Sequence, residues 1–412
     1  MRQIPASADA VVIGAGLAGL SAARQIKNSG RSVIVIEAQD GVGGRVRTDS
    51  VDGYLLDRGF QVLLTAYPEL KTQIDMKALD LRMFSSGAMV MRDGKASIVT
   101  DPFREPLRAG ATVFAKVGTV ADKLRVAALR WQVMHRDANK ILTNTDMSTV
   151  LALRQFGFSE KMIDRFFRPL FGGIQLDPEL KTSRRMFEII FKSLSEGRSA
   201  LPSRGMSAIP EQMATSFGTE NIFLNTRVTS IESGLVRTEH GKIAAKAIVV
   251  ATDQPNSSGL LRTKEIASRV VGCVYFSADV APTKEKFVVL DGTGEGPVLN
   301  AAVLTNVAPS YAPQGKHLIV AALPGVVTGD LEEFSRTQLR TWWGPQVDAW
   351  HHLKTYRITH AGPEQLPPFN PKQAVSLGGG VFVCGDHRDT GSIQGALYSG
   401  RRCGQAVVSL LA

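Results

Sequence analysis

The sequence predicts an α/β fold, and the order of features near its N-terminus carries that prediction. An apolar run at 10–13 indicates a buried strand, and a glycine-rich turn at 14–19 follows it directly and opens a helix. A second apolar run at 32–36 follows a turn at Gly30, and an acidic residue, Glu37, closes it. Strand, glycine turn, helix, strand and acid in this order are typical of a Rossmann-like unit that binds a dinucleotide.

The glycine turn predicts a phosphate site. We expect Gly14 to make the tight turn, Gly16 to let the backbone approach a pyrophosphate, and Gly19 to let the helix pack close to the strand. The free N–H groups and the positive dipole end of the helix would bind phosphate there. Glu37 would accept hydrogen bonds from both ribose hydroxyls and would repel a 2′-phosphate. These residues alone leave open whether the ligand is NAD or FAD, or whether the turn only serves packing.

A second glycine pair stands shortly after the acid. Gly43 and Gly44 would let the chain pass close to a cofactor, and the planar guanidinium of Arg45 could pair with a diphosphate, or it could be a surface cation. This run resembles the second FAD motif of the superfamily of flavin amine oxidases, phytoene desaturases and protoporphyrinogen oxidases. The stretch Asp57-Arg58-Gly59-Phe60-Gln61 resembles the segment that passes the flavin ring in that family.

The resemblance returns in order along the chain. The predicted strand that begins at 225–228 resembles one whose backbone pairs with adenine in the family, and 247–253 resembles a later motif, with Asp253 in place of a glycine. Gly385-Asp386 and the helix after it resemble the C-terminal motif. In the family, that pair meets the ribityl and pyrophosphate region, and the helix N-terminus points at the flavin pyrimidine. Two phosphate-binding ends far apart in sequence suit one extended FAD and do not suit one NAD.

The resemblance therefore implies FAD, and we expect it to be bound non-covalently because no cysteine resembles the covalent-flavin cysteine of monoamine oxidases. The flavin itself would carry the chemistry, and no catalytic side chain is assigned. His387-Arg388-Asp389 is expected to be a polar loop, with a place at the flavin edge as the alternative. The candidate cofactor-binding residues are Gly14, Ala15, Gly16, Leu17, Ala18, Gly19, Glu37, Ala38, Gly43, Gly44, Arg45, Gly59, Phe60, Gln61, Val228, Ala251, Thr252, Gly385, Asp386, Ser392, Ile393, Gln394, Gly395 and Ala396.

The positions of these motifs predict two domains. The FAD-binding domain is expected to be discontinuous, made of residues 1–85, 205–262 and 370–412. The intervening pieces, 86–204 and 263–369, would form a second α+β domain that binds substrate. Since 412 residues exceed one ordinary domain, the length agrees with this division.

The two pieces of the second domain have different patterns. The first, 86–204, is predicted to be mainly helical, with one helix that begins after Ser159 and runs toward Pro169. The second carries strand patterns at 270–276, 287–290 and 318–322, with loops at 291–297 and 365–371.

Composition narrows the class of protein. No apolar stretch reaches about 18 residues, so we expect no transmembrane helix, and no signal peptide fits before the first strand. Cys273, Cys384 and Cys403 lack the spacing of a metal site and indicate a reducing compartment, which predicts a cytoplasmic protein. The net charge is +10, but no nucleic-acid-binding motif accompanies it. The oligomeric state is not predicted.

Part of the basic excess lies between Phe103 and Lys140. Within this segment Leu124, Ala127, Ala128, Trp131 and Met134 recur at helical spacing, which predicts an amphipathic helix with a basic outer face. Such a helix is either a substrate-domain helix with a solvated face or a peripheral contact with an anionic membrane, where a lipophilic substrate would be loaded.

The helical piece also predicts the substrate. Residues 167–174, 176–180, Ser183 and 205–210 resemble the desaturase and protoporphyrinogen oxidase branch. Aromatic side chains in this piece either line a pocket for a flat or long apolar molecule or belong to the core. They are Phe156, Phe158, Phe166, Phe167 and Phe171.

These features predict an FAD-dependent oxidoreductase that takes a hydride from a lipophilic substrate, such as a carotenoid precursor or a porphyrinogen, and forms a C=C bond. Oxygen or a quinone would accept the electrons. Two alternatives stay open: an amine or amino acid oxidase that forms C=N, and a flavin-bearing binding or assembly protein with little turnover. Many flavin amine oxidases carry a lysine beside the flavin on a strand of the substrate domain. The most similar strand here, at 270–276, has Gly272 at that position.

Overall fold

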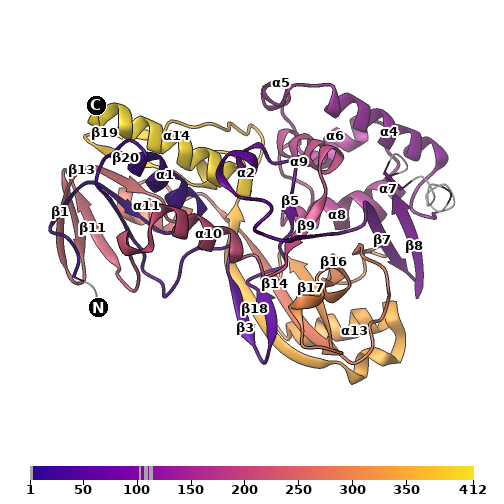
Figure 1. Ribbon diagram of the computed structural model, residues 1–412. Coiled ribbons are helices and arrows are strands. Elements are labelled where there is room, and N and C mark those ends of the chain that lie inside the picture. Colours follow the sequence, from indigo (N-terminus) through magenta and orange to yellow (C-terminus); the bar gives the residue numbers. More distant parts are fainter. Residues whose placement is uncertain (1–2, 102–103, 106–109, 111–114) are drawn as a thin grey trace.

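The computed structural model describes residues 3–101, 104, 105, 110 and 115–412. They form two lobes that lie side by side (Figure 1). One lobe contains both ends of the described chain and is built on an eight-stranded sheet. The other is built on a seven-stranded sheet with a layer of helices above it in the view of Figure 1. The α/β fold class predicted from the sequence is confirmed.

The eight-stranded sheet is parallel at its centre. The parallel strands pair in the order β10-β2-β1-β13-β20, so pieces from the beginning, middle and end of the chain meet here. Two strands extend the sheet in antiparallel fashion along the first half of β13, and a third pairs with β20. The strands are β1 (Ser7–Ile13), β2 (Val33–Ile36), β10 (Ile222–Phe223), β11 (Val228–Glu232), β12 (Leu235–Thr238), β13 (Gly241–Val250), β19 (Ser376–Gly378) and β20 (Val381–Val383).

Apolar side chains on both faces hold this sheet between helices. Ala10 and Val12 of β1 pack with α1 and α14, while Val11 and Ile13 pack in a second cluster, against which Leu260 of α11 lies. Both faces are therefore buried, as expected for parallel strands. The helices of this lobe are α1 (Leu17–Lys27), α2 (Pro68–Gln73), α10 (Ala208–Phe217), α11 (Gln254–Leu261) and α14 (Ile393–Leu411), with short 3₁₀ turns at Thr219–Asn221 and Asp386–Arg388.

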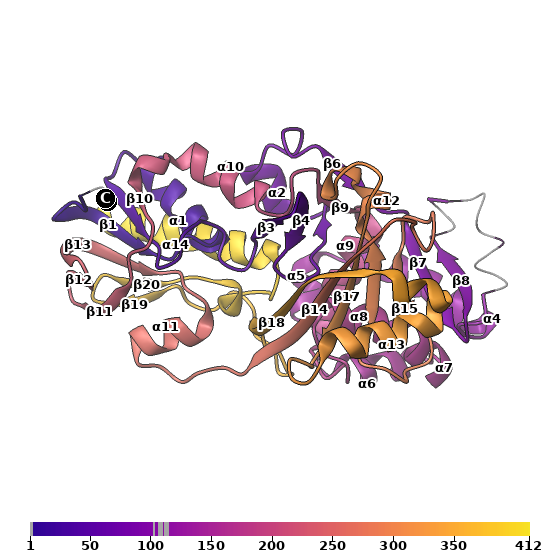
Figure 2. The ribbon, with the colours of Figure 1, turned by 90° about the horizontal axis from the view of Figure 1, so that it is seen from below.

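The seven-stranded sheet runs in the order β18-β14-β17-β16-β15-β7-β8. Helix α13 (Leu331–Trp343) covers one face, where Leu331, Leu339 and Trp342 pack against alternate side chains of the strands (Figure 2). The strands are β7 (Gly87–Arg92), β8 (Lys95–Thr100), β14 (Ser268–Ala278), β15 (Val288–Asp291), β16 (Asn300–Val303), β17 (His317–Pro324) and β18 (His351–Pro363). Helix α12 (Leu304–Val307) and 3₁₀ turns at Pro309–Tyr311 and Gly344–Ala349 connect them.

The predicted strands at 270–276, 287–290 and 318–322 are confirmed as β14, β15 and β17. The prediction that residues 86–204 are mainly helical is wrong at its start, because β7 and β8 join this sheet through the parallel pairing of β7 with β15. No signal in the first piece alone shows its partner strand, which is far away in sequence.

Helices from the middle of the chain form the layer above this sheet. They are α4 (Val120–Met134), α5 (Ala138–Leu142), α6 (Thr149–Gln155), α7 (Glu160–Met162), α8 (Arg168–Ile174) and α9 (Arg184–Glu196). The predicted N-cap is confirmed, since Ser159 Oγ accepts the N–H of Met162. The helix does not stop near Pro169, however. A π-helical turn at Ile163–Phe167 joins α7 to α8, and Pro169 directly follows this irregular turn.

Helix α4 exposes the face that the sequence predicted to be its inner one. Leu124 is 68% exposed and Trp131 is 66% exposed, whereas Leu129 and Val133 are buried. The orientation is set by Asp122, whose carboxylate accepts hydrogen bonds from Thr119 and Ser159 and so fixes the first turn against α7. The predicted helix is confirmed, but its basic-outside orientation is wrong because the outer face is apolar. Phe103 and Arg108 of the predicted basic segment lie outside the described residues.

Two small sheets occupy the space between the lobes. One pairs β3 (Thr48–Val51) with β4 (Tyr54–Asp57), and the other pairs β9 (Ser199–Pro202) with β5 (Leu63–Leu64) and β6 (Leu81–Met83). Asp57, at the end of β4, is buried and accepts hydrogen bonds from the Thr48 hydroxyl, the Met206 N–H and the Tyr311 hydroxyl. These contacts tie the strand before residues 58–61 to elements of both lobes.

Candidate active site

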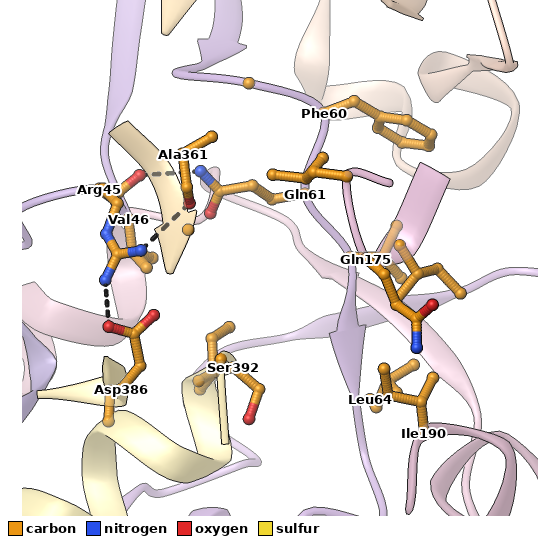
Figure 3. Close-up of a pocket in the computed structure, with 18 of the residues that line it drawn as sticks. Arg45, Val46, Phe60, Gln61, Leu64, Gln175, Ile190, Ala361, Asp386 and Ser392 are labelled. Atoms are coloured by element: carbon orange, nitrogen blue, oxygen red, sulfur yellow. Dashed lines mark hydrogen bonds and ion pairs between the residues drawn. The ribbon is translucent and has the colours of Figure 1, made fainter. Parts of the chain in front are cut away.

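A cavity of about 1430 Å³ runs from the glycine turn after β1 to the helical layer of the second lobe. Its walls come from both lobes and include β18, α8, α9 and the start of α14. All but four of the residues predicted to hold the cofactor line it. Figure 3 shows the middle of the cavity, where Arg45 and Asp386 lie on one side and Gln175 and Ile190 on the other.

The glycine turn has the geometry that a phosphate group requires. Gly14 has φ +105°, and its N–H donates to Ile36 O at 2.8 Å. A Cβ on Gly19 would lie 1.9 Å from Gly14 O, so only glycine lets α1 approach this closely. A Cβ on Gly16 would meet no protein atom within 4 Å and would project into the cavity. Gly16 therefore leaves open space at the N-terminus of α1, where an anion is stabilised.

Glu37 supports this turn from the neighbouring strand. One carboxylate oxygen accepts the N–H of Ala15 at 2.7 Å, and the other accepts the N–H of Gln39 at 2.9 Å. The side chain is buried but still lines the cavity. Each carboxylate oxygen keeps acceptor capacity for a ribose hydroxyl.

The second glycine pair lies against the first. Gly43 donates its N–H to Ala15 O at 2.8 Å, and a Cβ on Gly44 would lie 3.5 Å from Gly16 Cα. Arg45 follows and forms an ion pair with Asp386, with 2.6 Å between Nη2 and Oδ1 (Figure 3). Its Nη1 also donates to Ala361 O at 3.1 Å. Arg45 therefore joins the N-terminal motif, β18 and the C-terminal motif at one point.

Helix α14 presents its N-terminus to the cavity. Ser392 caps it by accepting the N–H of Gly395 at 3.0 Å, and Ser392, Ile393 and Ala396 line the cavity. Gln394 points elsewhere and accepts the N–H of Glu69. Four predicted residues lie behind the wall in packing positions: Ala15, Gly19, Gln394 and Gly395.

The far end of the cavity is lined mainly by apolar side chains, although charged residues such as Asp101, Lys123 and Arg130 also belong to the wall. Side chains from β5, the α7–α8 segment and α9 form its walls. Most of these side chains are buried, so this end can enclose an apolar molecule. The apolar lining residues are Leu64, Val117, Val126, Met162, Phe166, Leu170, Met186, Ile190, Phe191 and Leu194.

The sequence pattern of the flavin-containing amine oxidoreductase family matches residues 17–408. The chain belongs to this family. Membership places it among flavin-dependent oxidoreductases and implies an FAD cofactor. The residues fit that cofactor, because the open space at Gly16 and the N-terminus of α14 stand at two separate places along one cavity.

Individual members of the family resemble the chain over different lengths. Putrescine oxidase from Kocuria rosea is 28% identical over 242 residues, which are 54% of this chain and 49% of that protein. Phytoene dehydrogenase from Streptomyces griseus is 28% identical over 381 residues, 77% of this chain and 73% of that protein. The crystal structure of a putative protoporphyrinogen oxidase from Exiguobacterium sp. 255-15 has a TM-score of 0.73 at 16% identity, and covers 97% of this chain and 98% of that one. The chain thus matches only about half the length of the putrescine oxidase.

The aromatic residues predicted to line the pocket mostly do not. Of the five phenylalanines, only Phe166 lines the cavity, while Phe158, Phe167 and Phe171 are core residues. Phe156 lies beneath the Arg184 guanidinium instead. Met186, Ile190 and Leu194 line the cavity without having been predicted to do so, although their spacing of four residues on α9 identifies them as one helical face.

The strand expected to carry the family's lysine contains none. No residue of β14 is a lysine, and a Cβ on Gly272 would lie 2.6 Å from Leu331 Cδ1 and from Val326 O. Gly272 therefore faces α13, and the predicted placement of the missing lysine at this position is wrong. Its neighbour Val271 lines the cavity. Among the described residues, Lys123 is the one lysine of the cavity wall, and it donates to Ala115 O.

The polar loop after Asp386 is buried. His387 lies in the 3₁₀ turn that begins at Asp386, outside the cavity wall, and burial lowers its pKa to about 4. The ring is therefore neutral at pH 7. The three cysteines are free and buried, and no cluster of metal-ligating side chains occurs among the residues that the structure describes.

Proposed function

We propose that this protein is an FAD-dependent oxidoreductase that takes a hydride from a C–H bond of a lipophilic substrate and forms a C=C bond. Oxygen or a quinone would then accept the electrons. One observation carries the proposal: the apolar end of the cavity is continuous with the glycine cradle. A substrate held among Leu170, Met186 and Ile190 would share one enclosed space with the cofactor.

The residues of the chain have separate tasks in this proposal. Gly16, Gly44 and the N-terminus of α1 would hold the pyrophosphate, and Glu37 would hold the ribose. When bound, FAD would supply the hydride acceptor. The N-terminus of α14 favours negative charge at its end of the cavity. We propose the domain division predicted from the sequence, with 1–85, 205–262 and 370–412 around the cofactor and 86–204 and 263–369 around the substrate.

The composition of the cavity supports C=C formation over amine oxidation. An amine substrate would require recognition of a cation or an ordered water, and β14 supplies no lysine for this purpose. The relationship to phytoene dehydrogenase also covers more of the chain than that to putrescine oxidase. The latter relationship still favours an amine oxidase as the second candidate.

Anaerobic stopped-flow reduction of the flavin tests this proposal. A polyene and a porphyrinogen are compared with putrescine, benzylamine and an amino acid, each at the same concentration. We expect a lipophilic compound to bleach the flavin and the amines to leave it oxidised. Rapid bleaching by an amine alone would favour the second candidate, an amine oxidase.

Acid precipitation tests how the flavin is attached. It should release all the flavin, because we propose non-covalent binding; colour left in the pellet would contradict this.

We also propose that the protein is cytoplasmic and makes reversible peripheral contact with an anionic membrane through α4. In the described part of the chain, no helix combines the length and apolarity needed to cross a membrane. Leu124 is both exposed and part of the cavity wall, so the cavity opens at the apolar face of α4. Arg125 beside it and the exposed Lys116 and Lys140 would favour anionic lipid.

Sedimentation with vesicles tests the membrane contact. Phosphatidylcholine vesicles are compared with vesicles that also contain phosphatidylglycerol, at low and high salt. We expect binding to the anionic vesicles that salt weakens, because salt screens charge. Equal partition into both kinds of vesicle would exclude the electrostatic contact.

A further inference from the structure

One neutral side chain in the described wall of the cavity, Gln175, has an amide whose hydrogen-bonding groups are unused; the charged Arg269, which pairs with the neighbouring Asp177, also has a buried nitrogen, Nε, without a hydrogen-bond partner. Gln175 lines the cavity, and Figure 3 shows its amide end directed toward Leu64 and Ile190. Both the amide nitrogen and the amide oxygen are buried, and neither has a hydrogen-bond partner among the residues that the structure describes. A buried amide without protein partners is costly, so these groups need a partner inside the cavity, which is either an ordered water or a polar group of a ligand.

The nearby polar groups differ from Gln175 in this respect. Asn300 also lines the cavity, but its side-chain nitrogen donates to Pro169 O at 3.3 Å. The Thr182 hydroxyl donates to the Asp177 carboxylate at 2.7 Å. Gln175 is therefore the group in this region that offers both an unused donor and an unused acceptor.

The backbone holds Gln175 in this position. Its N–H donates to Phe171 O at the end of α8, and Leu176 then adopts φ +53°, a left-handed conformation that costs free energy for leucine. Asp177 fixes the turn, since its buried carboxylate accepts both the N–H and the hydroxyl of Thr182. Arg269 also pairs with Asp177 at 3.3 Å. A turn fixed by this network keeps the amide on the cavity wall.

We infer that Gln175 determines substrate specificity by binding a polar group on an otherwise apolar substrate. A group that both donates and accepts, such as a hydroxyl or a carboxamide, satisfies the amide oxygen and nitrogen together. A pure hydrocarbon leaves both unsatisfied. The inference rests on the proposed function, because it assumes that the apolar end of the cavity holds the substrate.

Three probes that differ in one substituent test this inference by equilibrium binding. They are 4-butylphenol, which donates and accepts; 4-butylanisole, which only accepts; and butylbenzene, which does neither. Titration into the FAD-loaded protein, followed by the change in flavin absorbance, gives a Kd for each. The quantity compared is the ratio of the Kd of butylbenzene to that of 4-butylphenol, so the ligands' own solvation cancels between variants.

We expect this ratio to fall at least about 10-fold in Gln175→Leu, because the phenol then loses its partner. The ratio of the Kd of butylbenzene to that of 4-butylanisole should fall less than the ratio for 4-butylphenol, because the anisole only accepts a hydrogen bond. Gln175→Met keeps the length of the side chain and serves as a second variant if Gln175→Leu fails to fold. Met186→Leu is the matched control: it changes the same cavity without changing a polar group, and it should leave the ratio as in the wild type.

An unchanged ratio in Gln175→Leu or Gln175→Met, with FAD content as in the wild type, would overturn the inference. So would a ratio that falls equally in Met186→Leu. Turnover is not measured in this experiment, so its outcome is separate from the test of C=C formation. The Kd ratio could fall in Gln175→Leu even if no polyene or porphyrinogen reduces the flavin. Conversely, a polyene or porphyrinogen could reduce the flavin even if the Kd ratio does not change.

Discussion

The two ends of the cavity are built in different ways. At the cofactor end, glycines form the part of the wall beside the N-terminus of α1, and they leave the space that a ligand would fill. At the substrate end, the wall consists mainly of apolar side chains from several elements, and Gln175, Asn300 and Lys123 are among the polar or charged residues between them. A site formed by glycines depends on a short run of residues, and most substitutions in that run would remove the site. A side-chain wall depends on packing and can change gradually, so it can determine which substrate binds.

The largest expected effect comes from Gly16→Val at the cofactor end. The backbone of Gly16 has φ −72°, which valine adopts without strain, and the new side chain would project into the cavity rather than into protein. We expect FAD affinity to fall at least about 1,000-fold, or about 4 kcal/mol, while the fold is kept. Flavin content after purification measures FAD binding, and far-UV circular dichroism shows whether the fold is kept.

Gly19→Ala is the matched control for that prediction. Its Cβ would overlap Gly14 O, so the damage should be a lower melting temperature of the protein with or without FAD. If Gly16→Val kept full flavin content, the cofactor would lie elsewhere and the contrast between the two ends would be lost.

The next effect concerns Asp57, which lies between the two lobes. Burial raises the pKa of Asp57 to about 6. The folded state therefore binds a proton that the unfolded state has lost, and the free energy of unfolding should fall by about 3 kcal/mol as pH rises from about 4 to above 6. Asp57→Asn should remove this part of the pH dependence, which urea unfolding at several pH values measures. An identical pH profile in the variant would show that Asp57 titrates normally.

A smaller effect is expected at the substrate end. Ile190→Phe enlarges a side chain that lines the cavity. We expect the affinity for butylbenzene to fall about 10-fold, in line with the cost of overpacking, and FAD content to stay at the wild-type level. Loss of flavin together with ligand affinity would show that the two ends are not independent.

The smallest effect is expected at the opening beside α4. Arg125→Gln removes one positive charge next to Leu124, and we expect about a fivefold weaker association with anionic vesicles, or about 1 kcal/mol. Lys242→Gln removes the same charge from an exposed position on β13 in the other lobe and should have no effect. An equal loss of vesicle association in the two variants would indicate that the net charge of the protein, rather than the face of α4, attracts the membrane.

The same contrast explains what the sequence could predict. The turn at Gly14, the acid at Glu37 and the Gly385-Asp386 pair lie within short motifs, and the structure brings them together along one cavity. Local sequence was sufficient there because glycine conformations and strand ends are local properties.

The substrate end could not be predicted in this way. In the sequence, nothing distinguishes Phe167 and Phe171 from Phe166. Only the packing of the helices places Phe167 and Phe171 in the core and Phe166 on the cavity wall. The orientation of α4 depends on Asp122 meeting Ser159, a contact between separate helices. Strand β18 mixes polar and apolar residues without a clear period, so only its pairing with β14 shows that it is a strand.

The central sheet also determines when the protein can finish folding during synthesis. Strand β1 pairs with β13, and β13 pairs with β20. Ile13 can therefore pair only after Val250 has been synthesised, and Val250 can complete its pairing only after Val383 has been synthesised. Helix α14 then packs on α1 so closely that a Cβ on Gly400 would lie 2.2 Å from Ala18 O. Until β13 has been made, β1 lacks one of its two partner strands, and until the last helix leaves the ribosome, α1 lacks the helix that packs on it. Such long-range parallel pairing is slow. A nascent chain that ends before residue 380 would hold the glycine turn but not the site that uses it.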